Sequence, residues 1–168
     1  GNGILPKEEP DAARIVLKSL QQDGVRLLGG GKDLELAKSA SGGICLRVQS
    51  PQLNYEETVD QVLIGVGRAP NVDGLGLENA GVEFSKKGVV VNDHLQTTCP
   101  HIYAAGDICS PFQFTHAADF MARIVIQNAL FMGRSRVSAL VIPWCTYTEP
   151  EIAHVGLYEN EAADQGIA

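Results

Sequence analysis

Cysteine is scarce in this sequence, and the few cysteines that occur form no motif. The 168 residues contain Cys45, Cys99, Cys109 and Cys145, which follow one another at intervals of 54, 10 and 36 positions. These intervals exclude a CxxC pair, and four thiols are too few for a disulfide scaffold in a chain of this length. We therefore expect buried or incidental cysteines without a redox or metal-binding role.

Metal-ligand spacing is lacking as well. His94, His101 and His154 are isolated from one another in the sequence and give no metal-ligand spacing. A structural or catalytic metal centre needs several such ligands at short, regular intervals. We predict no metal site.

The sequence also lacks an excess of positive charge and long hydrophobic runs. The 13 Lys and Arg residues stand against 20 Asp and Glu residues, a formal net charge of -7, which argues against nucleic acid as a partner. The longest apolar runs, such as Val62–Val66 and Ile124–Ile126, fall far short of the roughly 20 residues of a membrane span. No basic-then-apolar leader is visible. We expect a soluble, cytoplasmic protein without a membrane partner.

The first half of the sequence predicts one helix and three strands. Apolar residues recur at helical spacing from Asp11 until Asp23-Gly24. Strand patterns follow at Val25–Leu28, Ile44–Val48 and Thr58–Ile64, separated by glycines 29–31 and by turn signals at 50–54. These strands predict an antiparallel meander, and the mostly apolar third strand is expected to be buried on both faces.

The glycine-rich stretch 65–71, G-V-G-R-A-P-N, ends this block, and a second α/β block follows it. The expected elements are a helical turn near Leu77–Ala80, strands at Val82–Phe84, Val89–Val91, Trp144–Thr148 and Ala153–Leu157, and helices at about Thr115–Met132 and from Glu159 to Asp164. The longer helix carries a predicted apolar stripe of Ala118, Met121, Ala122, Val125 and Ala129, and Gly133 is expected to close it.

The run T-C-P-H-I-Y-A-A-G-D at 98–107 predicts a cofactor site. A short strand, Ile102–Ala104, leads to Gly106-Asp107, and α/β sheets present carboxylates to ligands beyond the carboxyl ends of their strands. An ordinary turn or helix-cap pair is the alternative reading of Gly106-Asp107 when the two residues are taken alone.

Four motifs together resemble one enzyme family. They are G-V-G-R-A-P-N at 65–71, L-Q-T-T-C-P-H-I-Y-A-A-G-D-I at 95–108, H-A-A-D-F-M-A-R at 116–123 and Y-T-E-P-E-I-A-H-V-G-L at 147–157. Their order and spacing are similar to those of the pyridine nucleotide-disulfide oxidoreductases, in particular mercuric reductases and dihydrolipoamide dehydrogenases. The resemblance covers nearly the whole chain, so it is far more specific than any single glycine-rich loop.

The resemblance implies a partial FAD- and NAD(P)-binding fold of the Rossmann-like α/β class. Residues 1–71 would be the later part of the NAD(P) domain, residues 72–140 the returning part of the FAD domain, and residues 141–168 the start of the dimerisation domain. The intact enzyme would be a homodimer that passes electrons from NAD(P)H through FAD to a cysteine pair and its substrate. Alternatives are a flavin oxidoreductase without a disulfide step and a catalytically silent α/β assembly module.

Several family signatures are absent from the sequence. There is no GxGxxG, because Gly65-Val66-Gly67 is followed by Arg68-Ala69-Pro70, and there is no redox CxxxxC. The family's catalytic His-Glu pair would lie beyond Ala168. We therefore interpret the chain as an internal fragment of a multi-domain reductase and expect no catalytic residues, no turnover and weak or absent FAD binding from the chain alone.

The resemblance also implies roles for individual residues. Asp107 would accept a hydrogen bond from a ribityl hydroxyl of FAD, and Gly106 would let the backbone approach the cofactor. The helix start at Thr115, His116 and Ala117 would direct free N–H groups at the pyrimidine edge of the flavin. His116 has helix capping or packing as an alternative role. Gly67 and Arg68 would border the nicotinamide cofactor or serve as a linker.

Overall fold

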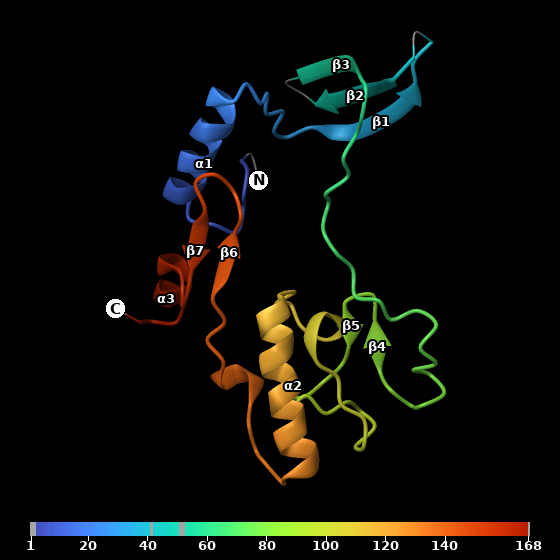
Figure 1. Cartoon of the computed structure of the whole chain (residues 1–168), viewed down its shortest axis with the longest axis vertical. Helices are drawn as coiled ribbons and strands as arrows, with labels where there is room; N and C mark the ends of the chain where they lie inside the picture. The colour runs from blue at the N-terminus through green and yellow to red at the C-terminus, as the bar shows by residue number, and fades with distance from the viewer. Residues whose placement is uncertain (1–2, 41, 51–52, 168) are drawn as a thin grey trace. The chain divides into compact units, whose positions relative to one another are not determined.

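The computed structural model describes residues 3–40, 42–50 and 53–167. The chain divides into two compact units, one formed by Gly1–Val66 with Cys145–Ile152 and the other by Gly67–Trp144 with Ala153–Ala168. The chain contains both helices and strands, which agrees with the predicted α/β class. Figure 1 shows the elements in chain order, coloured from blue to red.

Helix α1 (Pro10–Gln22) opens the first unit, as its sequence predicts. Pro10 stands at the first helical turn, where its missing N–H costs no hydrogen bond, and Asp11 supplies the acidic residue favoured there. Val16 is its buried residue. The helix stops at Asp23, and Gly24 follows with a φ of 83°.

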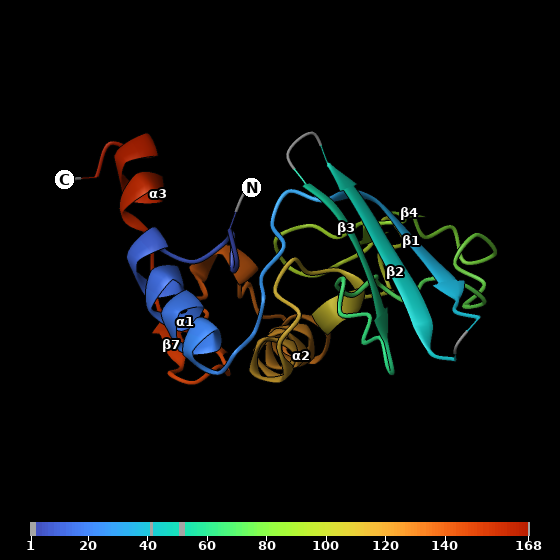
Figure 2. The same ribbon diagram turned by 90° about the horizontal axis from the view of Figure 1, so that it is seen from above.

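The meander of the first unit is antiparallel and three-stranded, which confirms that prediction. It consists of β1 (Lys32–Lys38), β2 (Ile44–Ser50) and β3 (Leu53–Val59), with β2 in the middle (Figure 2). Arg47 on β2 faces Glu56 on β3, and the side chains form an ion pair at 3.0 Å. The predicted turn at 50–54 falls partly on residues 51–52, which lie outside the described residues.

Two strand predictions in this unit are wrong. Residues 25–28 have no regular structure; there, the Arg26 guanidinium donates to the hydroxyl of Tyr55 at 2.8 Å and pairs with Glu57. The third strand ends at Val59 instead of running from Thr58 to Ile64. Leu63 is 96% exposed and Ile64 70% exposed, so this end of the stretch expected to be buried on both faces lies in solvent.

The second unit is built around helix α2 (Thr115–Leu130). Its other elements are the two-residue strands β4 (Phe84–Ser85) and β5 (Gly88–Val89), and the 3₁₀ turns η1 (Gly106–Ile108) and η2 (Val137–Ala139). The boundaries between the two units fall within strands β6 (Trp144–Thr146) and β7 (Ile152–His154), which pair with each other, and helix α3 (Glu159–Asp164) follows in the second unit. The positions of α2 and α3 agree with the sequence predictions.

Short β-segments in this unit replace the longer predicted strands. Residues 82–84 and 89–91 contribute to the short pair β4 and β5 and, at Val91, to an isolated bridge with Thr97; Ile102–Ala104 contributes a single bridge between Tyr103 and Gln96. The polypeptide before η1 is therefore a loop held by isolated backbone pairs. The hydroxyl of Thr97 reinforces it by donating to the carbonyl of Ile102 at 2.9 Å.

The core of the second unit has two clusters. One joins Leu95 and Ile142 to the buried face of α2, and the other consists of Val72, Val82 and Val89. The buried stripe of α2 is Ala117, Met121 and Ile124. The predicted stripe is correct at Met121 and close at Ala118 and Val125, which are partly buried. It is wrong at Ala122 and Ala129, which are exposed. Apolar residues surround most of this helix, so the sequence pattern alone does not fix its inward face.

Helix α2 ends before Gly133. The left-handed residue that turns the chain is Met132, with a φ of 52°. The Gly133 N–H then donates to the Gln127 carbonyl at 2.9 Å, and a Cβ at position 133 would lie 2.9 Å from that oxygen. Gly133 therefore permits the close return of the chain onto the helix, which is a packing role and not the left-handed cap expected from the sequence.

Candidate functional site

Gly106 allows the turn η1 to lie directly against α2. The preceding Ala105 is extended, and Gly106 itself is buried with a φ of 80°, a conformation that favours glycine. A Cβ at this position would lie 3.0 Å from the Cβ of Ala118. The glycine thus brings the backbone of the A-A-G-D motif to the first turn of the helix.

Asp107 projects from this turn as an exposed carboxylate. Its oxygens have no hydrogen-bond or ion-pair partner among the residues that the structure describes. An ionised carboxylate accepts hydrogen bonds through two oxygens, and such charge-assisted bonds are stronger than neutral ones. Asp107 is therefore available to hold a hydroxyl group of a ligand beside η1.

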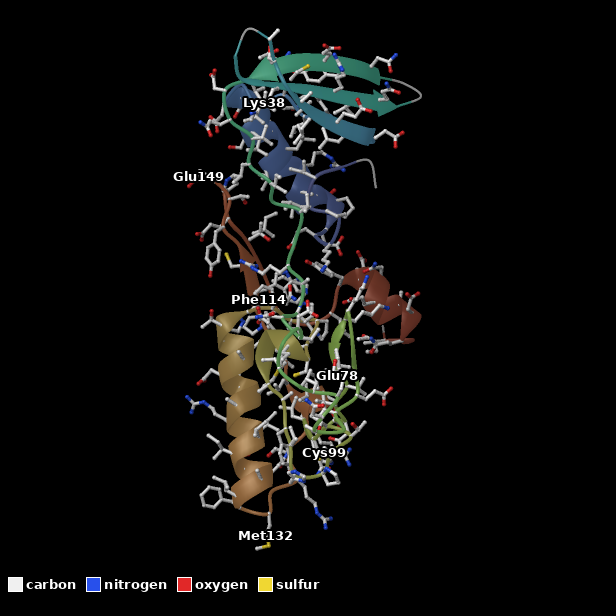
Figure 3. The ribbon with its side chains drawn as sticks, turned by 90° about the vertical axis from the view of Figure 1, so that its right-hand side faces the viewer. Lys38, Glu78, Cys99, Phe114, Met132 and Glu149 are labelled. Carbon is white, nitrogen blue, oxygen red and sulfur yellow. The ribbon has the colours of Figure 1, made fainter. Side chains whose placement is uncertain are left out.

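The N-terminus of α2 supplies hydrogen-bond donors on the same side of the unit. The residue before the helix, Phe114, is extended and provides no side-chain cap, and the first helical hydrogen bond runs from the Ala118 N–H to the Phe114 carbonyl. The N–H groups of Thr115, His116 and Ala117 consequently lack helical acceptors. Thr115 and His116 are exposed, whereas Ala117 is fully buried. Figure 3 labels Phe114 at this end of α2.

The His116 side chain is already committed to protein contacts. Its Nε2 lies 2.6 Å from the carbonyl oxygen of Pro143, and because a carbonyl can only accept, Nε2 carries a proton and donates. The ring also stacks on Phe114 at a centroid distance of 5.4 Å and an interplanar angle of 11°. These contacts fix the start of α2, so a ligand there would meet the backbone N–H groups of the first turn.

Gly67 and Arg68 lie in the extended segment that enters the second unit. Both are exposed, and Gly67 has a φ of 115°. Within the described residues, no hydrogen bond or ion pair joins either of them to η1 or to the start of α2. The structure therefore brings Gly106, Asp107 and the α2 N-terminus together, and it leaves Gly67 and Arg68 without a direct bond to that group.

Gly88, which the sequence analysis did not single out, connects this segment to η1. A Cβ on Gly88 would overlap the Ile108 carbonyl oxygen and would lie 3.5 Å from Cγ of Pro70. The φ of Gly88 is 120°, which also requires glycine. The signal for this position is the S-K-K-G-V sequence, in which a two-residue turn is followed by a glycine at the start of the returning strand.

Cys109, directly after η1, is a protonated thiol at neutral pH. Burial raises the pKa of Cys109 to about 11, and its sulfur lies 3.6 Å from the Gly106 carbonyl. All four cysteines are free. Among the described residues, no group of three or more potential ligands is arranged to hold a metal ion, and no helix is long and apolar enough to cross a membrane.

Comparison with known proteins identifies the family. The family model described as pyridine nucleotide-disulphide oxidoreductase matches residues 1–122, well over half of the chain. The chain belongs to this family. The match confirms the resemblance that the four sequence motifs indicate.

Individual relatives agree with this assignment. The chain is 39% identical over 160 residues to a dihydrolipoyl dehydrogenase of Bacillus subtilis, covering 95% of this chain and 34% of that protein. It is 36% identical over 160 residues to a mercuric reductase of Staphylococcus aureus, covering 94% of this chain and 29% of that protein. The chain therefore spans about a third of the length of these curated relatives.

Solved structures show the same fold. LpdA of Mycobacterium tuberculosis matches with a TM-score of 0.84 and 27% identity, covering 97% of this chain and 35% of LpdA. The HOCl-induced flavoprotein disulfide reductase RclA of Escherichia coli matches with a TM-score of 0.81 and 28% identity, covering 96% of this chain and 37% of RclA. The α/β architecture is thus that of flavoprotein disulfide reductases.

Proposed function

We propose that this chain is the part of an FAD-dependent oxidoreductase that holds the ribityl and pyrimidine portions of the flavin. Residues 1–71 would belong to the NAD(P)-binding domain, residues 72–140 to the FAD-binding domain and residues 141–168 to the beginning of a dimerisation domain. Family membership supports this division. The observation that carries the proposal is the packing of Gly106-Asp107 against the uncapped N-terminus of α2.

The geometry of η1 and α2 fits a flavin. The Asp107 carboxylate has both oxygens available to accept a ribityl hydroxyl, and Gly106 keeps the backbone beside it free of side-chain atoms. When bound, FAD supplies the hydride and electron transfer between NAD(P)H and the acceptor. The residues of this chain would bind and orient the cofactor.

The first turn of α2 adds an electrostatic contribution. The free N–H groups of Thr115, His116 and Ala117 and the positive end of the helix dipole favour negative charge near the helix start. His116 keeps this turn in place through its bond to the Pro143 carbonyl. A flavin whose pyrimidine edge faces these donors would be easier to reduce, because reduction places negative charge there.

Gly67 and Arg68 would border the nicotinamide cofactor. Two features support this placement: the segment is exposed, and Pro70, two residues further on, packs beside Gly88 next to the Ile108 carbonyl. The Arg68 guanidinium can pair with a phosphate or carboxylate group of a ligand.

In the intact enzyme, electrons would pass from NAD(P)H through FAD to a cysteine pair located outside this sequence, and then to a disulfide or metal-ion substrate. The names of the relatives, which include dihydrolipoyl dehydrogenases and mercuric reductases, support both substrate classes. The intact enzyme would act as a cytoplasmic homodimer that contributes to cell redox homeostasis.

A chimera tests this function. Replacing the corresponding third of the Bacillus subtilis dihydrolipoyl dehydrogenase, 39% identical, with this chain should give a flavin-containing protein that oxidises NADH. In that chimera, Asp107→Asn should weaken FAD binding about tenfold, because one charge-assisted hydrogen bond is lost. FAD affinity is measured by titrating the deflavinated protein and following flavin fluorescence.

Asp119→Asn provides the matched control. Asp119 is an exposed carboxylate on α2 that pairs with Arg123 on the same helix at 2.8 Å. The substitution Asp119→Asn removes the same charge as Asp107→Asn but should leave FAD affinity unchanged. A folded chimera without flavin would overturn the proposal, and so would equal FAD affinities for Asp107→Asn and Asp119→Asn.

A further inference from the structure

The unit formed around α2 contains a pocket at the opposite end of this helix from Asp107. It has a volume of about 420 Å³, and its walls include His94, Tyr103, Asn128, Gly133, Arg134 and Arg136. Asn128 belongs to the last turn of α2, and Met132, labelled in Figure 3, marks that end of the helix. Sixteen residues of helix separate the two ends by about 24 Å, so this pocket is distinct from the proposed flavin contacts.

The loop that forms one wall of the pocket, residues 133–136, is firmly held. The Asn128 side chain donates to the carbonyl of Ser135 at 2.9 Å and accepts from the Ser135 N–H at 2.9 Å. His94 Nδ1 also lies 2.9 Å from the Ser135 carbonyl, so this nitrogen carries the proton and donates. Ser135 is thereby fixed against the helix, and its neighbours Arg134 and Arg136 are displayed from a pre-ordered backbone.

The two guanidinium groups are available for a ligand. Arg134 is exposed and has no side-chain partner among the described residues. Arg136 pairs with Asp93 at 3.9 Å, and the two oxygens of Asp93 also accept shorter bonds from the N–H and the hydroxyl of Ser138, both at 2.8 Å. In a chain with a net charge of -7, Arg134 and Arg136 place two cations beside one pocket, and only Arg136 has a carboxylate partner among the described residues.

We propose that this pocket binds a small molecule through a phosphate monoester. Guanidinium groups bind phosphate oxygens in a planar, two-pronged geometry, and two arginines from one fixed loop match the two charges of the group. The hydroxyl of Tyr103, which has no hydrogen-bond partner in the described part of the chain, adds a neutral donor. The volume exceeds that of a bare phosphate and leaves room for an attached organic group.

The common structural role of arginines near a helix C-terminus is to neutralise its carbonyl groups. Here backbone groups already satisfy one of these carbonyls, since the Gln127 carbonyl accepts the N–H groups of both Phe131 and Gly133. Arg134, which has no side-chain partner among the described residues, is therefore left for an external anion.

Isothermal titration calorimetry of the full 168-residue chain in a phosphate-free buffer tests the proposal. The probes are adenosine 5′-monophosphate, inorganic phosphate and adenosine. We expect the nucleotide and phosphate to bind, the nucleotide more tightly, and adenosine to give no heat. Arg134→Gln and Arg136→Gln should each weaken nucleotide binding about tenfold, because each removes charge-assisted hydrogen bonds.

Arg123→Gln is the matched control, since Arg123 is an exposed arginine on α2 that already pairs with Asp119. It should bind the nucleotide as the unmodified chain does. Circular dichroism and thermal unfolding verify that each variant remains folded. Equal affinities in Arg134→Gln and Arg123→Gln, binding of adenosine as tight as that of the nucleotide, or no binding of either phosphate compound would overturn the proposal.

Discussion

Glycines at special backbone angles determine how closely loops approach each other in the unit around α2. Gly88 and Gly106 both have positive φ, and at both positions a Cβ would meet a neighbouring segment. Gly74 has a positive φ too, but a Cβ there would meet no atom within 4 Å. Alanine substitutions at these three positions therefore separate the loss of stability caused by the backbone angle from the loss caused by close packing.

Gly88→Ala should destabilise the chain by about 3 kcal/mol, because the new methyl group overlaps the Ile108 carbonyl and the φ of 120° is unfavourable for alanine. Gly74→Ala should cost only about 1 kcal/mol, the price of the left-handed angle alone. Urea unfolding followed by circular dichroism measures both values. Equal losses for the two variants would show that contact with Ile108 is unimportant.

The thiol of Cys109 makes stability depend on pH in the alkaline range. Burial raises the pKa of Cys109 from 9.0 to about 11, so the folded state holds the thiol proton more tightly than the unfolded state. The contribution of the protonated thiol to the free energy of unfolding is fully present below about pH 9 and is lost as the pH rises towards 11. The free energy of unfolding of the unmodified chain should therefore fall relative to that of Cys109→Ala between these values.

The measurement is urea unfolding of both proteins at several values between pH 8 and about 11, where the difference between them isolates the Cys109 contribution. A difference that stays constant across this range would contradict the buried, protonated thiol. Slow modification of Cys109 by a thiol reagent at neutral pH provides an independent check, because the thiolate is the reactive form.

Helix α2 organises the second unit through one face only. Ile124 is 6% exposed in the cluster with Leu95 and Met121, whereas Ile126, two residues on, is 50% exposed. Ile124→Ala should destabilise the chain by about 3 kcal/mol through lost burial and the cavity left behind. Ile126→Ala should cost less than about 1 kcal/mol, since alanine also favours the helix.

Thermal and urea unfolding of these two variants measure the difference. Both remove the same atoms from the same helix, so helix propensity and side-chain entropy cancel in the comparison. A cost for Ile126→Ala equal to that for Ile124→Ala would place the buried face of α2 elsewhere.

Elements with local signals were the ones that the sequence could predict. Helices α1, α2 and α3 begin and end close to their expected positions, because helical periodicity and terminal residues act within one or two turns. Thr58–Ile64 was mispredicted because an apolar run shows strand propensity without showing whether a partner strand exists. Strand β1 was missed because it consists of Lys, Asp, Leu, Glu and Ala, none of which is a strong strand former, and because a bulge interrupts its pairing with β2.

In the candidate site, too, contacts between residues close in sequence could be predicted, and contacts between distant residues could not. The A-A-G-D motif and the start of α2 are close in sequence, so their adjacency through Gly106 and Ala118 follows from short-range structure. Gly88 meets Ile108 across 20 positions, and His94 meets Ser135 across 41. Contacts over such separations depend on tertiary packing, which a single sequence does not reveal.

At the scale of the whole molecule, large apolar side chains remain in solvent. Leu63, Ile64 and Val66, in the extended segment after β3, are 96%, 70% and 92% exposed. Extended apolar segments with unpaired backbone groups are ready to add to another strand. This segment therefore offers an exposed apolar surface for association between copies of the chain.

We expect the chain to self-associate in a concentration-dependent manner, as seen by sedimentation velocity. Leu63→Lys combined with Val66→Lys should shift the chain towards monomer, because it removes two exposed apolar side chains and adds charge to the segment. Gln61→Lys combined with Asn71→Lys adds the same charge at exposed polar positions nearby and should leave most of the association intact. A monomeric unmodified chain, or equal dissociation by both pairs of substitutions, would show that apolar contact through this segment does not drive assembly.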